Sequence, residues 1–324
     1  MKRFAAVAVS AGLALSFPAP AVAQSEARFV DAIEYARPAG EPLLLDAYLP
    51  AGDGPHPAVI FIHGGGWTGG SRRDLRPELA AEFTDRGMAI FSIDYRLAPD
   101  WTFPAPFADG QAAVRWIRGH AEEFDVDPAR IATYGQSAGG LLAVLIGVAG
   151  EGPLDEDARV RATVSWSGPM DISLPVFQSK QAVRAFLGCA DRECLEIARE
   201  ASPVTHVDGS DAATLIANST DELVPFVGNV TMAEALETAA IPHQLIEVPG
   251  NVHVGFYDTR VPPKNETVLE ETLSFLETSL ASDRGEHTDL DVRKLLPFVL
   301  SGVAVFAIAF GLVRTRLARR RRRY

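Results

Sequence analysis

The sequence predicts a doubly wound, mostly parallel α/β sheet with a small insertion between two of its strands. Three observations predict this fold. The middle of the chain carries short, uninterrupted apolar runs, which suit strands buried on both faces of a parallel sheet. Stretches with helical spacing of apolar residues separate these runs. The repeated order of strand, helix and strand then places helices on both faces of one sheet.

The predicted strands begin with a hairpin and continue as buried runs. Segments 29–35 and 43–48 form the hairpin. The apolar runs that follow are 58–62, 88–93, 131–134, 162–166, 214–217 and 244–248. The helices predicted between and after them cover 76–86, 107–123, 138–148, 230–239 and 266–280.

Residues 171–207 interrupt this alternation. They show no clean strand pattern, only short helical pieces at 181–187 and 193–200. Since they fall between two core strands, we expect them to form a cap over a site. Cys189 and Cys194 lie in this insertion, and their spacing leaves open whether they form a disulfide.

The N-terminal residues have the pattern of a secretory signal. Lys2 and Arg3 precede an apolar stretch that is short for a membrane span, and small residues follow at 21–23. This order of charged region, apolar region and A-x-A-like site predicts cleavage after Ala23. An uncleaved N-terminal anchor is the alternative.

The C-terminal residues have the pattern of a membrane anchor. Residues 295–313 carry no charge and, as a helix, would be roughly 28 Å long, close to the thickness of a hydrocarbon core. Arginines crowd the tail at 314–324, which the positive-inside rule assigns to the cytoplasm. We therefore expect an exported domain held on a bacterial cell membrane by one C-terminal helix. A sorting tail that is removed later is the alternative.

The organisation that these patterns predict has one large domain. It comprises a signal peptide at 1–23, an α/β domain at 24–280 with its cap at 171–207, a tether at 281–294, a transmembrane helix at 295–313 and a basic tail at 314–324. The formal net charge of −12 argues against nucleic acid as a partner. The oligomeric state is left open by the sequence.

A candidate nucleophile follows the predicted strand 131–134. Gly135, Ser137 and Gly139 form a G-x-S-x-G pattern at the point where this strand meets the apolar helix 138–148. In such an elbow the serine sits on a strained turn that lifts its hydroxyl above the sheet, and the glycines avoid a clash where the chain reverses. The pattern at this junction therefore predicts a catalytic serine, and a helix N-cap is the alternative role.

A serine nucleophile needs a base, and the base needs a carboxylate to orient it. In the chain order Ser, Asp/Glu, His, the base is predicted to be His253, which lies in the loop after the last strand. That loop is at the sheet edge where sites of open α/β folds form. Asp221, in the loop after the preceding strand, is the predicted carboxylate. Glu222 is the alternative, and Asp258 is less favoured because it follows the histidine.

The chain resembles a known family in five motifs that occur in order. These are HGGGW at 63–67, DYRLAP at 94–99, GQSAGG at 135–140, STDELVP at 219–225 and PGNVHVGF at 249–256. Together they are similar to the α/β-hydrolase superfamily, in its hormone-sensitive-lipase-like carboxylesterase branch. The resemblance runs from about residue 29 to 280. Small feruloyl- or acetyl-esterase-like enzymes and arylformamidases share this architecture, and the motifs do not separate them.

This resemblance implies a serine hydrolase that cleaves carboxylic esters, preferably short-chain ones, through an acyl-enzyme on Ser137. A small-molecule ester is the expected substrate, with no cofactor and no metal ion. An arylformamidase or another amide hydrolase on the same triad is the alternative, and a non-catalytic binding module is the third reading.

The family pattern also implies an oxyanion hole. Ala138, Gly65 and Gly66 would supply its N–H donors, and Trp67 would line the substrate site or serve packing alone. His63 is expected to shape the loop rather than act as a second base. On this reading, Gly65→Ala should lower turnover far more than it lowers stability.

Overall fold

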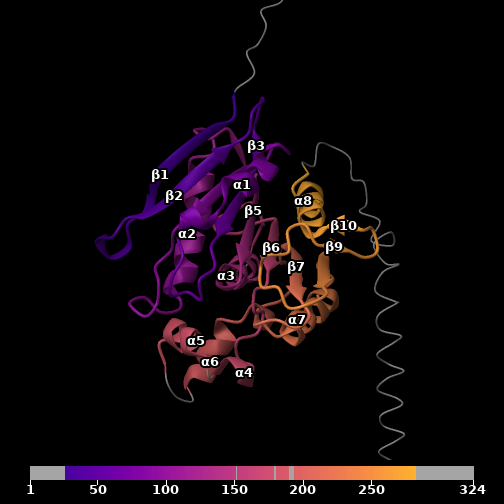
Figure 1. The fold of residues 1–324 in the computed structure, drawn as a ribbon. Coiled ribbons are helices and arrows are strands. Elements are labelled where there is room, and N and C mark those ends of the chain that lie inside the picture. Colours follow the sequence, from indigo (N-terminus) through magenta and orange to yellow (C-terminus); the bar gives the residue numbers. More distant parts are fainter. Residues whose placement is uncertain (1–25, 151, 179, 190–192, 282–324) are drawn as a thin grey trace, which may run out of the picture. The chain divides into compact units, whose positions relative to one another are not determined.

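An eight-stranded sheet forms the centre of the protein (Figure 1). The computed structural model describes residues 26–281 except 151, 179 and 190–192. The strands are β1 (Arg28–Ala36), β2 (Leu43–Leu49), β3 (His56–Ile62), β4 (Ala89–Ile93), β5 (Val126–Gln136), β6 (Ala162–Trp166), β7 (Ala213–Ser219) and β8 (His243–Val248). Their order is β1-β2-β4-β3-β5-β6-β7-β8. β2 pairs antiparallel with β1 and β4, and all neighbours from β4 to β8 are parallel.

Helices cover both faces of this sheet because its strands carry apolar side chains on both faces. The helices are α1 (Pro77–Thr84), α2 (Ala105–Gly119), α3 (Ala138–Val148), α4 (Pro175–Gln178), α5 (Gln181–Leu187), α6 (Glu193–Glu200), α7 (Phe226–Thr238) and α8 (Val268–Ser279). Along β3, Ile60 packs in one cluster with residues of α2 and α3, whereas its neighbour Phe61 packs in another with residues of α1 and α8. Residues of α3, α7 and β7 form a third cluster.

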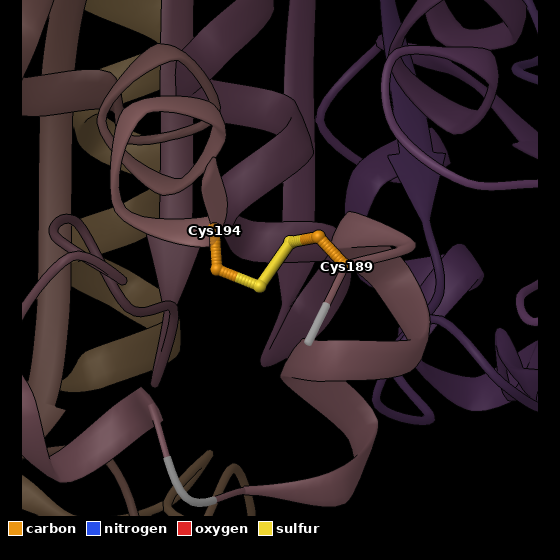
Figure 2. The surroundings of a disulfide bond; sticks show 2 residues. All are labelled: Cys189 and Cys194. Atoms are coloured by element: carbon orange, nitrogen blue, oxygen red, sulfur yellow. A yellow bond between two sulfur atoms is a disulfide. The ribbon is translucent and has the colours of Figure 1, made fainter. Parts of the chain in front are cut away.

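The short helices α4, α5 and α6 form the cap, the segment between β6 and β7 (Figure 1). A disulfide between Cys189 and Cys194 joins the end of α5 to α6 (Figure 2), with 5.3 Å between the two Cα atoms. The bond settles the pairing that the sequence left open. It adds a covalent cross-link between the two longer cap helices.

Most sequence predictions of secondary structure are confirmed. All eight strands are present, and α3 and α5 have the predicted bounds. The predicted helix at 230–239 begins earlier, at Phe226, and the one at 107–123 is shifted toward Ala105–Gly119. The sequence did not predict a short antiparallel pair, β9 (Arg260–Val261) and β10 (Glu266–Thr267). Three 3₁₀ helices occur in the described part, at Pro38–Gly40, Arg72–Asp74 and Pro203–Thr205.

The predicted architecture needs one correction, which concerns the membrane. Among the described residues, none of the helices has both the length and the apolar character that a membrane crossing requires. The signal peptide, most of the tether, the helix at 295–313 and the basic tail were predicted for residues outside the described part. The architecture that the described residues support is therefore an α/β sheet with flanking helices and a cap. By its internal contacts the chain separates into two units, and the first of them ends at Ala281.

Candidate active site

Ser137 forms the whole connection between β5, which ends at Gln136, and α3, which begins at Ala138. Its backbone has φ 53° and ψ −119°, a region that is strained for a residue with a Cβ. Its N–H donates to the carbonyl of Trp166 at 2.8 Å. The strained turn at a strand–helix junction that the sequence predicted is therefore present.

The glycines on either side of Ser137 are required by the space around the turn. A Cβ on Gly135 would lie 2.1 Å from the carbonyl oxygen of Gly139, and a Cβ on Gly139 would lie 2.0 Å from that of Ile62. These neighbours are backbone atoms and have no rotamer to change. The close approach to Ile62 also holds the elbow against the end of β3, where the glycine-rich loop begins.

The structure brings Ser137, His253 and Glu222 into one hydrogen-bonded chain. His253 Nε2 is 2.9 Å from Ser137 Oγ, and its Nδ1 contacts Glu222 Oε2. The Glu222 side chain is fully buried, whereas 29% of the His253 side chain is exposed. With an N–H on Nδ1 donating to the carboxylate, Nε2 is the nitrogen that accepts from the serine hydroxyl.

The preference for Asp221 over Glu222 is corrected by this geometry. Asp221 is exposed, and its backbone N–H donates to the carbonyl of Gly250 at 2.9 Å. That bond pairs the loop after β7 with the loop after β8. It leaves the next residue, Glu222, to reach the imidazole, so the alternative that the sequence offered is the one found beside His253.

Two serines hold the backbone on either side of His253. Ser219 Oγ donates to the carbonyl of Val252 at 2.7 Å, and Ser167 Oγ accepts from the N–H of Val254 at 3.2 Å. Ser167 directly follows Trp166, whose carbonyl binds the N–H of Ser137. The end of β6 therefore contacts both the nucleophile turn and the histidine loop. The sequence analysis missed both roles: Ser167 lies in none of the five motifs, and Ser219 opens the STDELVP motif, which signals a carboxylate rather than a serine.

The glycine-rich loop lies beside the elbow. A Cβ on Gly64 would be 3.4 Å from Ser137 Cβ and 3.1 Å from the carbonyl oxygen of Gln136. Gly65 and Gly66 follow with φ of +103° and +62°. Ala138 is the first residue of α3, so its N–H has no acceptor within the helix. The donors that the family pattern implies thus belong to segments that adjoin Ser137.

The expected effect of Gly65→Ala is also corrected. A Cβ at this position would lie 2.2 Å from the carbonyl oxygen of Gly69, and its φ of +103° disfavours any L side chain. The substitution would therefore disturb the fold of the loop as well as turnover.

His63 has the loop-shaping environment that the sequence suggested. Its ring stacks on Tyr95 with 4.2 Å between centroids, and Nδ1 donates to the carbonyl of Gly64 at 2.8 Å. Burial lowers the pKa of His63, although this hydrogen bond and the charges of Asp74 and Asp94 act the other way. A neutral, buried imidazole fixed to its own loop is not placed to act as a second base.

Trp67 connects the glycine-rich loop to the cap. It is 3% exposed, and its indole stacks on Phe186 of α5 with 4.4 Å between centroids. A Cβ on Gly66 would lie 3.3 Å from the Cβ of Ala182, also in α5. The cap therefore packs directly on the loop that adjoins Ser137.

Lys180 connects the cap to the loop of Glu222, and the sequence gave no signal for it. Its Nζ donates to the carbonyl of Leu223 at 2.8 Å and lies 4.9 Å from the ring centroid of Phe177. Burial lowers the pKa of Lys180, and the negative charge of Glu222 opposes that shift. A cation is thus held near the buried carboxylate of the site.

A buried carboxylate, an imidazole and an elbow serine on a mostly parallel α/β sheet define the class of serine hydrolases with the α/β-hydrolase fold. The BD-FAE family model matches residues 45–236, which is more than half of the chain. The chain belongs to the BD-FAE family. The resemblance to the carboxylesterase branch of the α/β-hydrolases is confirmed by its relatives.

Several of these relatives are ester hydrolases. The chain is 41% identical over 110 residues to the carboxylic ester hydrolase LipN of Mycobacterium tuberculosis, which covers 34% of this chain and 29% of that protein. It is 36% identical over 111 residues to ethyl acetate hydrolase of Pseudomonas putida, covering 33% and 35% respectively. The chain thus spans about a third of the length of these two relatives.

Solved structures resemble the chain over a larger part. A truncated carbohydrate esterase from gut microbiota superposes with a TM-score of 0.69 at 23% identity, covering 81% of this chain and 99% of that one, which supports the fold. The propionate-bound esterase Est2 of Thermogutta terrifontis superposes with a TM-score of 0.61 at 27% identity, covering 80% and 94%.

Proposed function

We propose that this protein is a serine ester hydrolase that cleaves short-chain carboxylic esters through an acyl-enzyme on Ser137. The observation that carries the proposal is the hydrogen-bonded chain from Ser137 Oγ through His253 to the buried Glu222. The ester hydrolases among its relatives support the same reaction class.

In the first half of the reaction, Ser137 Oγ bonds to the ester carbonyl carbon while its proton moves to His253 Nε2. Glu222 stabilises the resulting imidazolium and keeps the ring in position. When the tetrahedral intermediate collapses, the alcohol leaves with the proton from Nε2, and an acyl group stays on Ser137. A water molecule then gives a proton to Nε2 and attacks the acyl carbon. When this second tetrahedral intermediate collapses, the bond to Ser137 Oγ breaks, Nε2 returns its proton to Oγ, and the acid is released.

The negative charge on the carbonyl oxygen needs fixed donors. We assign this role to the backbone N–H groups of Ala138, Gly65 and Gly66. The two loops that carry them adjoin each other at Gly64 and Ser137. Each such donor lowers the barrier by about 3 to 4 kcal/mol in known hydrolases.

The preference for short acyl groups is supported by the packing around the glycine-rich loop. Phe186 and Ala182 of α5 lie directly against Trp67 and Gly66, so the cap bounds this side of the loop. The names of the relatives agree, since one hydrolyses ethyl acetate and Est2 has been solved with propionate and with butyrate. Trp67 thereby acts on the substrate site through packing with the cap.

The test compares the full chain with Ser137→Ala on p-nitrophenyl acetate, butyrate, octanoate and an N-formyl aryl amide. We expect hydrolysis of the acetate and butyrate that depends on Ser137 and declines toward octanoate. Equal, slow hydrolysis by both proteins would refute the proposal. Turnover of the formyl amide alone would instead assign an arylformamidase.

We also propose that the catalytic domain works in an oxidising compartment outside the cytoplasm. The Cys189–Cys194 disulfide supports this, because such bonds persist mainly in exported proteins. Fractionation of the native host, with mass spectrometry of the cap peptide, tests it. We expect the disulfide-linked peptide in the exported fraction, and a protein recovered only from the cytoplasm with free thiols would contradict it.

A further inference from the structure

Gln136 occupies a variable position of the elbow motif, directly before Ser137. It is the last residue of β5. Its side-chain Nε2 donates to two hydroxyl groups, that of Tyr134 at 2.6 Å and that of Tyr257 at 3.2 Å. Tyr257 lies four residues after His253. The Gln136 amide therefore joins the nucleophile turn to the segment that follows the base.

The ring of Tyr257 is held in place by contacts other than this hydrogen bond. It makes a T-shaped contact with the Trp166 indole, with 5.0 Å between centroids, and the Arg76 guanidinium lies 4.6 Å from its centroid. The Tyr257 carbonyl accepts from the N–H of Leu269 in α8 at 3.2 Å. Because β6, α8 and the residue before α1 all contact Tyr257, its hydroxyl meets Gln136 from a fixed position.

The backbone between His253 and Tyr257 is strained. Val254 has φ +56°, a conformation that is unfavourable for a β-branched residue. Such a conformation persists only where the surrounding structure imposes it. The hydroxyl of Ser167 accepts from the Val254 N–H at 3.2 Å, and the side chain of Phe256, two residues further on, is buried. The hydrogen bond of Tyr257 adds a polar anchor at the far end of the strained segment.

We propose that Gln136 and Tyr257 are positioning residues, whose hydrogen bond aligns His253 with Ser137 by tying the histidine loop to the nucleophile turn. The proposal rests on the proposed function, since it concerns proton transfer within the same triad. Without this bond, the strain at Val254 can relax and displace the imidazole. A displacement of about 1 Å at a catalytic group can cost 10²-fold in rate, so one hydrogen bond has a measurable effect.

The two partners of this bond differ in what their removal disturbs. Tyr257→Phe removes one hydroxyl and keeps the ring contacts with Trp166 and Arg76. Gln136→Leu removes both N–H donors of the amide, and the buried Tyr134 hydroxyl then loses this partner, which costs stability. Tyr257→Phe is therefore the cleaner variant, and Gln136→Leu serves as the background in which its effect is measured again.

The test is a double-mutant cycle of Tyr257→Phe and Gln136→Leu in the full chain, with p-nitrophenyl acetate as substrate. Tyr48→Phe is the matched control, because it removes the hydroxyl of another half-buried tyrosine, on β2, which lies away from β7 and β8 in the sheet. Steady-state kinetics give kcat, KM and the pH profile of kcat/KM, and melting temperature verifies each fold. Hydrogen–deuterium exchange of the peptide 250–258 reports on the loop without turnover.

We expect Tyr257→Phe to lower kcat about fivefold with KM within about twofold of the wild type, and to speed exchange in the peptide 250–258. In the Gln136→Leu background the same substitution should lower kcat by less than about twofold, because the bond that it removes is already absent. The midpoint of the pH profile should stay unchanged, since the hydroxyl acts on the alignment of His253 and not on its ionisation. Tyr48→Phe should match the wild type throughout.

Each of three results would overturn the proposal. The kcat losses could multiply in the double variant, which would mean that the two residues act separately. The pH midpoint could shift in Tyr257→Phe, which would mean that the hydroxyl acts on ionisation. Exchange and kcat could both stay at wild-type values. A failure of the proposed function is distinct, since Ser137→Ala would then hydrolyse the ester as fast as the wild type, and the exchange rates would still decide whether the bond holds the loop.

Discussion

The Glu222 carboxylate is fully buried, and its role depends on its contact with His253. One of its oxygens contacts His253 Nδ1, while the other has no hydrogen-bond partner among the described residues. A buried polar atom without a partner costs free energy. The protein carries this cost at the position where a negative charge stabilises the imidazolium of the reaction. Asp221, one residue earlier, is exposed and carries no such cost.

The adjacent carboxylates provide a matched pair of variants. Glu222→Gln should reduce kcat on p-nitrophenyl acetate by about 10³- to 10⁴-fold, because an amide cannot stabilise the imidazolium and favours the wrong tautomer. Asp221→Asn should stay within about twofold of the wild type, since surface changes away from the site have small effects. Steady-state kinetics check both. A larger loss in Asp221→Asn would reassign the acid.

The glycines of the elbow predict an effect on stability. Gly139→Ala would push a Cβ to 2.0 Å from the carbonyl oxygen of Ile62, so the backbone must move. We expect a loss of at least about 3 kcal/mol in the free energy of unfolding. Gly119→Ala is the control, because a Cβ there meets nothing within 4 Å at the end of α2, and it should add about 0.5 to 1 kcal/mol. Urea unfolding that gives equal stabilities would contradict the steric account.

At the scale of elements, the cap is joined to the site at two places. Stacking of Trp67 on Phe186 joins α5 to the glycine-rich loop. The bond from Lys180 to Leu223 joins the segment before α5 to the loop that carries Glu222. The cap therefore contacts the loops of both the oxyanion donors and the acid, and changes in its packing reach both.

Lys180 allows the second of these contacts to be tested. Lys180→Met keeps the aliphatic stem but removes the hydrogen bond and the positive charge near Glu222. We expect kcat to fall about tenfold, because the loop that carries Glu222 loses a charged hydrogen bond worth about 1.5 to 3 kcal/mol. The melting temperature should fall by a few degrees for the same reason. Lys180→Arg should restore most of the rate. If the methionine variant is as active as the wild type, the contact does not position the acid.

At the scale of the whole molecule, stability should depend on the protonation of Asp211, near the start of β7. Burial raises the pKa of Asp211 to about 6; the charge of Asp208 adds to this, whereas the Asp208 N–H bond and the charge of Arg159 oppose it. In the unfolded chain the pKa is about 3.9. Between these values the folded state binds more protons than the unfolded state, so this group's contribution to stability falls as the pH rises.

Asp211→Asn is neutral at every pH and should remove this decline. Relative to the wild type, the variant should gain melting temperature as the pH rises from about 4 to 6, and the difference should level off above that range. Differential scanning fluorimetry across the pH series checks it, and other carboxylates cancel in the difference between the two curves. Parallel curves would mean that Asp211 keeps an ordinary pKa.

The sheet was predictable because burial leaves a regular trace in the sequence. Both faces of β3 are covered from Ala58 to Ile62, where every residue is apolar, so this run stands out. β9 and β10 have two residues each, too few for any pattern. The nucleophile and the histidine were identified by their positions after strands.

The choice between Asp221 and Glu222 could not be made in the same way. Neighbouring residues in a loop share the same sequence context, and the direction of each depends on a bond to another loop, here from Asp221 to Gly250. The roles of Ser167 and Lys180 have the same origin. Each acts through a contact with a residue far away in the chain, which no local spacing encodes.

The end of β6 has a consequence for anyone who wishes to transplant this site onto another scaffold. Trp166 accepts a hydrogen bond from Ser137, and Ser167 accepts one from the residue after His253. These two residues therefore set the separation between nucleophile and base, although neither belongs to the triad. A displacement of about 1 Å at such a distance can cost 10²-fold in rate. A graft that copies the triad and the glycine-rich loop but omits this dipeptide would reproduce the chemistry without its alignment.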